Sequence, residues 1–331
     1  MLMKQAPISR IRIVVQGGFA LLCLFAGYRF YQFYGWASGQ SPIYVAKPAT
    51  VEGFLPISAL LGLKRFVMTG LWDEVHPAGL TIFIGALTLA LFLRKAFCGW
   101  VCPVGFVSNL TAKLGKILGL QHELPPWLDY PILCVKYLLL AFFCYIILWK
   151  MDVQMIEAFL YSQYNLVVDA RMLLFFLHPS ALTLKVLGVL FLASLVVRNF
   201  WCRYLCPYGA LLGIGALIGP LQVKRNSSLC INCKRCEQVC PAAIHITRNR
   251  AIRHPECIGC VECVEVCPRR GCLALEAPTE KRIPIYAFPV AVVGIIGLFW
   301  TVAVLTGHWH AAVPLEAFRH LYPAASLVMH P

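Results

Sequence analysis

Eight of the sixteen cysteines in this chain fall into two copies of one spacing. Each copy reads Cys-x2-Cys-x2-Cys-x3-Cys-Pro, and the copies begin at Cys230 and Cys257. Thiolate sulfur is a soft ligand that suits iron–sulfur iron, and this run of four cysteines is typical of [4Fe-4S] clusters. The spacing therefore predicts two [4Fe-4S] clusters in a chain that carries electrons.

The fourth cysteine of each run is expected to bind the cluster of the other run, as it does in bacterial two-cluster ferredoxins. The predicted ligands are Cys230, Cys233, Cys236 and Cys267 for the first cluster, and Cys257, Cys260, Cys263 and Cys240 for the second. Zinc sites use pairs of cysteines, so zinc is the weaker interpretation. Disulfides are weaker still, because neighbours on one tight loop strain the bridge geometry. Cys272, just beyond the second run, is not expected to be a ligand.

The part of the chain before these runs contains a repeat. Three short blocks return in the same order and at nearly the same offset along the chain. They are Glu52-x-Phe54-Leu55 and Glu157-x-Phe159-Leu160, His76-Pro77 and His178-Pro179, and Cys98-x3-Cys102-Pro103 and Cys202-x3-Cys206-Pro207. Parallel repeats of this kind occur in membrane transporters. The repeat predicts two helical hairpins of the same orientation.

The repeated cysteines Cys98, Cys102, Cys202 and Cys206 would form a four-thiolate set if the two hairpins meet. The functional interpretation is a third metal site, either another cluster or a transient copper or thiol site. The structural interpretation is a group of packed free thiols at a helix junction. The repeat preserves the cysteines together with their aromatic neighbours, which favours the metal site. The spacing does not decide which metal.

The repeated histidines and glutamates are candidates for proton transfer. A quinol loses two protons as it loses two electrons, so its site needs acceptors such as neutral histidine or carboxylate. The residues predicted to accept these protons are His76, His178, Glu52 and Glu157. The alternative is that these side chains cap and orient the starts of helices. Quinol would then be a substrate only in the first interpretation.

The composition indicates a polytopic α-helical membrane protein. Hydrophobic residues make up 60% of the chain, charged residues 13%, and the mean hydropathy is +0.72. Five apolar stretches are long enough, or nearly so, to cross the bilayer. They are Ile11–Phe33, Pro77–Leu93, Pro131–Trp149, Ala181–Val197 and Pro284–Leu305. Lys136 lies near the end of its stretch, where its ammonium is expected to reach the membrane interface.

The expected order of parts combines membrane hairpins with a small α+β two-cluster ferredoxin domain. The parts are the first hairpin (1–105), a cytoplasmic loop (106–130), the second hairpin (131–222), the ferredoxin domain (223–282), a fifth transmembrane helix (283–306) and a periplasmic tail (307–331). The segment from Arg198 to Arg282 holds thirteen Lys and Arg residues against six Glu. The positive-inside rule then predicts a bacterial inner-membrane protein whose N-terminus and ferredoxin domain are cytoplasmic. The net charge of +14 is attributed to topology. No nucleic-acid partner is expected, because no basic helix accompanies a known reading module.

With these motifs in view, the chain resembles the membrane-bound ferredoxins of the NapH/MauN, NosR and CcoG group. The shared features are the two Cys-x3-Cys-Pro motifs and the two ferredoxin runs, and Glu52–Ser58 with His76–Gly79 is similar to NapH in particular. The resemblance covers roughly residues 10 to 280. It implies a quinol dehydrogenase or electron conduit that serves periplasmic reductases, with a periplasmic ferredoxin, a multihaem cytochrome or a reductase as partner.

Two departures from the group leave alternatives open. NapH-like chains usually stop after the ferredoxin domain, whereas this chain adds the stretch Pro284–Leu305 and a short tail. A fifth span is similar to CcoG-like proteins, but those carry a periplasmic β-domain for which this tail is too short. The alternative functions are a CcoG-like copper reductase or assembly factor, and an anchoring subunit of a larger respiratory complex.

Overall fold

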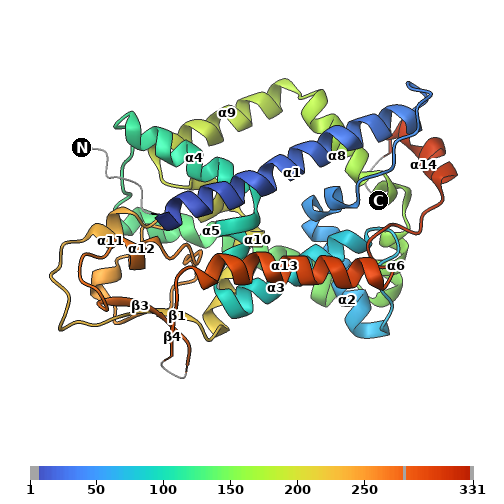
Figure 1. Cartoon of the computed structure of the whole chain (residues 1–331). Helices are drawn as coiled ribbons and strands as arrows, with labels where there is room; N and C mark the ends of the chain where they lie inside the picture. The colour runs from blue at the N-terminus through green and yellow to red at the C-terminus, as the bar shows by residue number, and fades with distance from the viewer. Residues whose placement is uncertain (1–6, 279–280, 329–331) are drawn as a thin grey trace. The chain divides into compact units, whose positions relative to one another are not determined.

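The computed structural model describes residues 7–278 and 281–328, and it is mostly helical with one small sheet (Figure 1). The chain divides into two compact units. Unit 1 comprises the described residues of Met1–Ala20, Ala86–Leu140 and Gly188–Ile295. Unit 2 comprises those of Leu21–Gly85, Ala141–Leu187 and Ile296–Pro331. The boundary falls within five long helices, each of which contributes residues to both units. They are α1 (Pro7–Ala37), α3 (Pro77–Leu93), α5 (Pro126–Cys144), α9 (Ala181–Val196) and α13 (Ala287–Leu305).

Each of the five predicted spans corresponds to one of these helices. Among the described residues, three helical segments are long and apolar enough to cross a membrane by themselves. They are Pro7–Ala37, Pro126–Lys150, in which α5 continues into the π-helical turn η3 (Tyr145–Lys150), and Ala287–Leu305. Helix α3 has 17 residues and is slightly shorter than these. The number of spans therefore stays a prediction.

The fourth predicted span, Ala181–Val197, corresponds to helix α9, which has 16 residues and is preceded by a sharp bend. Helices α8 (Val168–Leu177) and α9 are bent by 79° at the break between them, and they meet the length requirement only as a pair. Pro179 explains the break, because proline disfavours helical geometry at the residue before it. That residue, His178, has φ −126° and ψ 63°, outside the helical region.

The two Cys-x3-Cys-Pro motifs adopt the same local structure in unit 1. A π-helical turn contains the first cysteine of each motif and ends just before the second, η2 (Phe97–Val101) in the first motif and η4 (Trp201–Leu205) in the second. The second cysteine is then the extended N-cap of a helix that begins at the proline, α4 (Pro103–Ile117) or α10 (Pro207–Ile218). Proline suits a first helical position because its fixed φ matches the helix and its missing N–H is not needed there. The sequence repeat is thus also a repeat of structure.

A four-stranded antiparallel sheet follows α10 in unit 1, in the order β2-β1-β3-β4. The strands are β1 (Gln222–Arg225), β2 (Ala251–Ile252), β3 (Leu273–Glu276) and β4 (Arg282–Ile283). Strand β3 alternates buried and half-buried residues, so Leu273 and Leu275 face the core. The loops between the strands carry both cysteine runs and two short helices, α11 (Arg235–Gln238) and α12 (Glu262–Glu265). Together these elements form a small α+β domain.

Each cysteine run turns at a residue of left-handed geometry. Lys234 (φ 55°) precedes α11, and Val261 (φ 52°) precedes α12. Both residues lie between the second and third cysteines of their runs. Left-handed geometry is costly for residues other than glycine, and it persists where the surrounding structure requires it. The two runs therefore fold as matching tight loops.

Unit 2 contains an aromatic core. Phe33 of α1 is fully buried and packs edge-on against Phe318 and Tyr322, with ring centroids 5.6 and 5.7 Å apart. These partners come from α14 (Leu315–Leu321) and the turn η6 (Tyr322–Ala324) in the predicted tail. Residues 329–331 of that tail lie outside the described residues. A second core joins α2 (Pro56–Thr69) to α6 (Val153–Leu160) through Leu61, Ile147, Ile156 and Leu160.

Candidate iron–sulfur and proton-accepting sites

The cysteines predicted for the first cluster share one cavity in unit 1. The cavity is lined by Cys230, Cys233 and Cys236 of the first run and by Cys267 of the second. Cys233 is exposed and Cys236 is buried, so one side of the cavity faces solvent and the other faces the protein interior. An interleaved ligand set requires Cys267 to lie with the first run. The side chains present at this cavity fit a [4Fe-4S] cluster.

A fifth thiol lies in the same cavity. Cys272, which precedes β3, is buried, lines the cavity, and donates to the Asn226 carbonyl with its Sγ 3.7 Å from the oxygen. Burial, with Cys267 and Cys230 nearby, raises the pKa of this thiol to about 12. Cys272 was not expected to be a ligand, because its spacing from the run matches no ligand pattern. Only the pairing of β1 with β3 brings it to this place.

The cysteines predicted for the second cluster lie deeper in the domain. Cys240 and Cys260 are buried, and Cys257 and Cys263 are partly buried. Burial, followed by the neighbouring thiols of Cys260, Cys240 and Cys257, raises the pKa of Cys263 well above its ordinary value. A bound metal group would counter this effect, since it stabilises the thiolate form. The donor set therefore fits a second cluster.

The thiols of the two Cys-x3-Cys-Pro motifs are partly buried and lie close enough to influence one another. Burial raises the pKa of Cys98, Cys102 and Cys202 to about 12, and the thiols of the other motif add to this in each case. The Sγ of Cys206 accepts a hydrogen bond from the Gly209 N–H at 3.3 Å. Such thiols are neutral unless a cation ionises them. They form a set that fits a third site.

Within the described residues, no three His, Cys, Asp or Glu side chains are grouped closely enough to hold a single metal ion. The three ligand sets named above therefore remain predictions. The placement of the thiols in shared surroundings supports them.

The first Cys-x3-Cys-Pro turn contacts the loop of the second cysteine run. Arg94 donates to the carbonyls of Ala216 (2.6 Å) and His254 (2.7 Å), and Trp100 Nε1 donates to the Gly259 carbonyl at 3.0 Å. A Cβ atom on Gly99 would lie 2.5 Å from the Ile258 carbonyl oxygen. Only glycine permits this approach. The turn and the loop are thus in direct contact beside Cys257 and Cys260.

The second turn contacts the segment that follows Cys240. Arg198 donates to the Cys240 carbonyl and Asn199 to the Pro241 carbonyl, both at 3.0 Å. Arg203 donates to the Ala242 carbonyl and pairs with Asp129 at 2.7 Å. Cys240 is the predicted ligand of the second cluster that comes from the first cysteine run. Both halves of the repeat therefore contact the segments that carry the second cysteine set.

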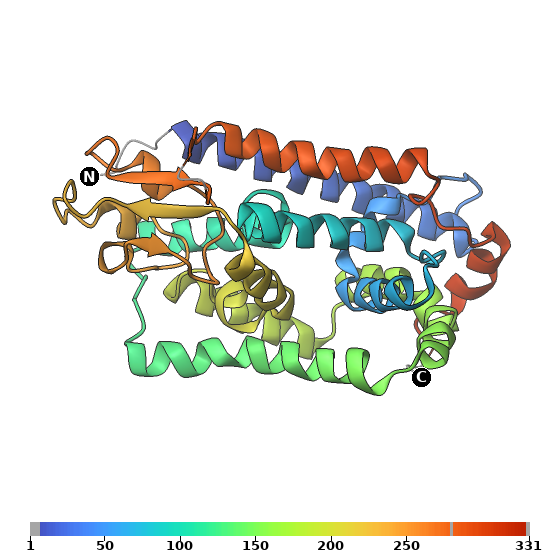
Figure 2. The same cartoon turned by 90° about the horizontal axis from the view of Figure 1, so that it is seen from below.

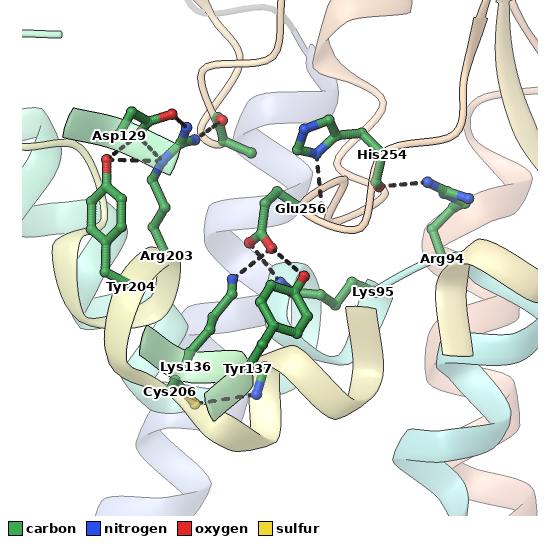
Figure 3. Close-up of polar contacts among 12 residues, drawn as sticks. Arg94, Lys95, Asp129, Lys136, Tyr137, Arg203, Tyr204, Cys206, His254 and Glu256 are labelled. Atoms are coloured by element: carbon green, nitrogen blue, oxygen red, sulfur yellow. Dashed lines mark hydrogen bonds and ion pairs between the residues drawn. The ribbon is translucent and has the colours of Figure 1, made fainter. Parts of the chain in front are cut away.

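A buried ion cluster joins these elements (Figure 3). Glu256, next to Cys257, lies between Lys95 at 3.0 Å and Lys136 at 2.5 Å, and Tyr137 donates to the same carboxylate at 3.3 Å. The side chains of Glu256 and Lys95 are each 3% exposed and that of Lys136 is 0% exposed. The expectation that Lys136 reaches the membrane interface is wrong. Its ammonium is held by a carboxylate 120 residues away in the sequence.

Unit 2 brings together two of the four predicted proton acceptors. Glu52 and His76 are both 1% exposed, and His76 Nδ1 lies 3.7 Å from the Glu52 carboxylate. His76 Nε2 lies 2.9 Å from the Asn165 carbonyl, so Nε2 carries the hydrogen and Nδ1 faces Glu52. The other Glu52 oxygen accepts the N–H groups of Ala78 and Gly79 at the start of α3. Burial opposes the imidazolium form, but the nearby Glu52 carboxylate raises the pKa of His76 above its ordinary value.

Three further ionisable residues, Lys47, Asp169 and Tyr322, complete this cluster. Lys47 pairs with Asp169 at 2.7 Å and approaches Glu52 at 3.5 Å. Tyr322 donates to the other oxygen of Asp169 at 2.9 Å. Asp169 is fully buried, which is rare for an aspartate without a structural or functional reason. Its position in the apolar segment Val167–Leu174 was the available signal.

The repeated partners of these two residues lie elsewhere. His178 is exposed at the end of α8, and Glu157 is 42% exposed and pairs with Arg65 at 3.3 Å. The structure therefore brings Glu52 and His76 together but gives His178 and Glu157 different surroundings. The repeat of the residues is not matched by a repeat of their environment.

Family models match the two copies of the repeat and the dicluster segment separately. A model described as "4Fe-4S binding domain" matches twice, at residues 75–121 and 177–225, and each match contains one Cys-x3-Cys-Pro motif. A model described as "4Fe-4S dicluster domain" matches residues 222–268, which hold all eight cysteines of the two runs. The chain contains iron–sulfur domains, and its repeat is recognised as one domain type in two copies.

Curated relatives share most of the chain. The protein named "Putative electron transport protein YccM" from Escherichia coli K12 is 41% identical over 300 residues, which cover 88% of this chain and 84% of the relative. The ferredoxin-type protein NapH of Haemophilus influenzae is 32% identical over 50% of this chain and 55% of its own length. The methylamine utilization ferredoxin-type protein MauN of Methylorubrum extorquens is 29% identical over 57% and 62%. This chain belongs to the NapH/MauN-type family of membrane ferredoxins.

Membership of the NapH/MauN-type family makes the chain an electron-transport membrane protein with iron–sulfur clusters. No solved structure is significantly similar to it. The contacts between the Cys-x3-Cys-Pro turns and the dicluster domain are described above for this chain alone.

Proposed function

We propose that this chain is a quinol dehydrogenase component of the bacterial inner membrane that passes electrons between the quinone pool and a periplasmic reductase system. In this proposal the N-terminus and the ferredoxin domain are cytoplasmic, as the Lys and Arg distribution predicts. The redox chemistry belongs to the clusters and the quinone, and the protein supplies positions and charges. Unit 1 carries the electron-transfer groups, and unit 2 carries the proton acceptors.

The observation that carries the proposal is the contact of both Cys-x3-Cys-Pro turns with the second-cluster segments. Trp100 binds the carbonyl beside Cys260, and Arg198 binds the carbonyl of Cys240 itself. Short, rigid contacts of this kind hold redox groups at fixed separations. They support an electron route through the first cluster, the second cluster and a third centre held by Cys98, Cys102, Cys202 and Cys206.

The proton acceptor proposed in unit 2 is the pair of His76 and Glu52. When His76 is neutral, its Nδ1 lone pair faces the Glu52 carboxylate, which stabilises a proton that arrives there. A base with a raised pKa accepts a quinol proton more readily than ordinary histidine does. Lys47 and Asp169 balance the charge around the pair.

A spectroscopic redox titration with stopped-flow reduction by menaquinol tests the proposal. We expect the clusters of the wild-type chain to be reduced by menaquinol, and His76→Gln to slow this reduction about a hundredfold, the usual effect of losing a positioned base. Cluster content should be unchanged. His178→Gln is the matched control, because that histidine is exposed. Unchanged reduction in the His76→Gln/His178→Gln double variant would exclude the proposed acceptor.

A second candidate, a CcoG-like copper reductase or assembly factor, is favoured by the four partly buried thiols alone. It requires that chemically pre-reduced clusters of the chain give one electron to each Cu(II), which forms Cu(I), in a step that depends on Cys98, Cys102, Cys202 and Cys206 and that needs no quinol. Measuring Cu(I) formation by the wild-type chain and by the Cys98→Ser/Cys202→Ser variant separates the two functions. Quinol-driven cluster reduction without Cu(I) formation would exclude the second.

A further inference from the structure

The cavity of the first cysteine set opens on a surface with an apolar centre and a basic rim. Cys233 is exposed, and Leu229 and Ile231 beside it are 43% and 53% exposed. Lys234 and Arg269 line the cavity. We define the basic rim as Lys234 and Arg269 together with their exposed neighbours Arg235 and Arg270. A small apolar centre within a charged rim is the usual anatomy of a protein interface.

Four of the five described glutamates of the dicluster domain are engaged elsewhere, and the fifth, Glu237, lies near Lys234 of the rim. Glu237 accepts hydrogen bonds from Thr247, Glu256 lies between two lysines, Glu262 pairs with Arg12, Glu265 accepts the Ile8 N–H, and Glu276 pairs with Lys224. These five are the described glutamates of the dicluster domain. Glu237 therefore offsets part of the charge of Lys234, and the four basic side chains of the rim keep a net positive charge that faces solvent.

The two cysteine sets differ in what covers them. The segments of the second set contact the Cys-x3-Cys-Pro turns, through the Cys240 and Gly259 carbonyls. The first set lies beside the loop after β1, which turns at the edge of the domain away from α10 (Figure 2). Of the two sets, the first is thus the one that a soluble molecule can approach.

We propose that an acidic soluble one-electron carrier docks on the basic rim and exchanges electrons with the first cluster. This inference rests on the electron-transfer role proposed above and names the partner at the dicluster end of the route. In the step, a reduced carrier ferredoxin loses one electron and its cluster goes from 1+ to 2+, while the first cluster goes from 2+ to 1+. No bond forms or breaks, and no proton moves. Opposite charges steer such short-lived encounters and raise the association rate.

Direct binding tests this proposal without any quinol turnover. The full chain is held in nanodiscs of phosphatidylcholine, and binding of an acidic two-cluster ferredoxin is measured by biolayer interferometry at 25 and 150 mM NaCl. The test variant is Lys234→Glu/Arg269→Glu. The control is Arg253→Glu/Lys281→Glu, which changes the net charge equally at exposed residues outside the cavity lining. Because binding is the readout, failure of the quinol proposal leaves this result interpretable.

We expect the wild-type chain to bind the ferredoxin at 25 mM NaCl and to bind it at least about tenfold more weakly at 150 mM. The Lys234→Glu/Arg269→Glu variant should bind about tenfold more weakly than wild type at 25 mM, and the control should stay within about twofold. Equal weakening by both variants would show a net-charge effect and overturn the docking surface, as would absence of binding at 25 mM. Loss of association with phosphatidylglycerol vesicles, with ferredoxin binding unchanged, would assign the rim to a membrane surface instead.

Discussion

Replacing Glu256 by Gln is expected to destabilise unit 1 strongly. The substitution keeps the side-chain shape but removes the charge between Lys95 and Lys136, at 3.0 and 2.5 Å. Breaking a buried ion pair by removing one partner costs about 3–5 kcal/mol. The loss has an upper bound, because one lysine can become neutral, which at pH 7 costs on the order of 5 kcal/mol. We therefore expect a loss of about 3–5 kcal/mol.

Thermal unfolding in detergent, followed by tryptophan fluorescence, measures this loss. A decrease of 3–5 kcal/mol corresponds to a fall in the midpoint of roughly 10 °C. Glu123→Gln is the matched control, because Glu123 is 66% exposed and its pair with Arg198 is long at 3.5 Å. An exposed pair of this kind contributes below about 1 kcal/mol.

A rescue variant separates charge pairing from packing. Lys95→Met/Glu256→Leu/Lys136→Met removes the whole cluster and leaves no unpaired buried charge, so its stability should return near that of the wild type. A Glu256→Gln midpoint within 2 °C of the control would refute the reasoning, since it would mean that water or another group already screens the two lysines.

Three further predictions concern the contact between the first Cys-x3-Cys-Pro turn and the loop of the second cysteine run, the proton site, and the cavity of the first cysteine set. Gly99→Ala places a Cβ atom 2.5 Å from the Ile258 carbonyl oxygen and should cost about 1–3 kcal/mol of unfolding free energy, whereas Gly188→Ala, where a Cβ atom meets nothing within 4 Å, should not destabilise the chain in the same thermal assay. The ion pair of His76 stabilises unit 2 fully below pH 6.5, and this stability should be lost as the pH rises through the raised pKa of His76; a plot of unfolding midpoint against pH should flatten in His76→Gln, and a curve parallel to wild type would contradict the assignment. Cys267→Ser should keep part of its first-cluster signal in electron paramagnetic resonance because Cys272 lines the same cavity, and Cys267→Ser/Cys272→Ser should lose it; equal spectra of these two variants would exclude Cys272 as a substitute ligand.

The local features of this chain could be predicted from the sequence. Cysteine spacing is a property of single loops, and each run indeed folds as a tight loop with a left-handed residue between its second and third cysteines. The five apolar stretches correspond to helices, and the repeated Cys-x3-Cys-Pro motif has the same turn in both copies. These predictions depend on residues close together in the chain, where backbone geometry and apolar length decide the outcome.

The long-range pairings were decided only by the tertiary structure. Lys136 and Glu256 are 120 residues apart, and the sequence around each of them does not indicate that they form an ion pair. The pairing of β1 with β3 brings Cys272 to the first cavity. His76 lies beside Glu52, whereas its repeated counterpart His178 is exposed. A repeated sequence specifies repeated backbone, but the surroundings of each copy depend on the different segments that pack against it. The predicted cluster ligands thus follow from spacing along the chain, whereas the charges and contacts around them arise from packing.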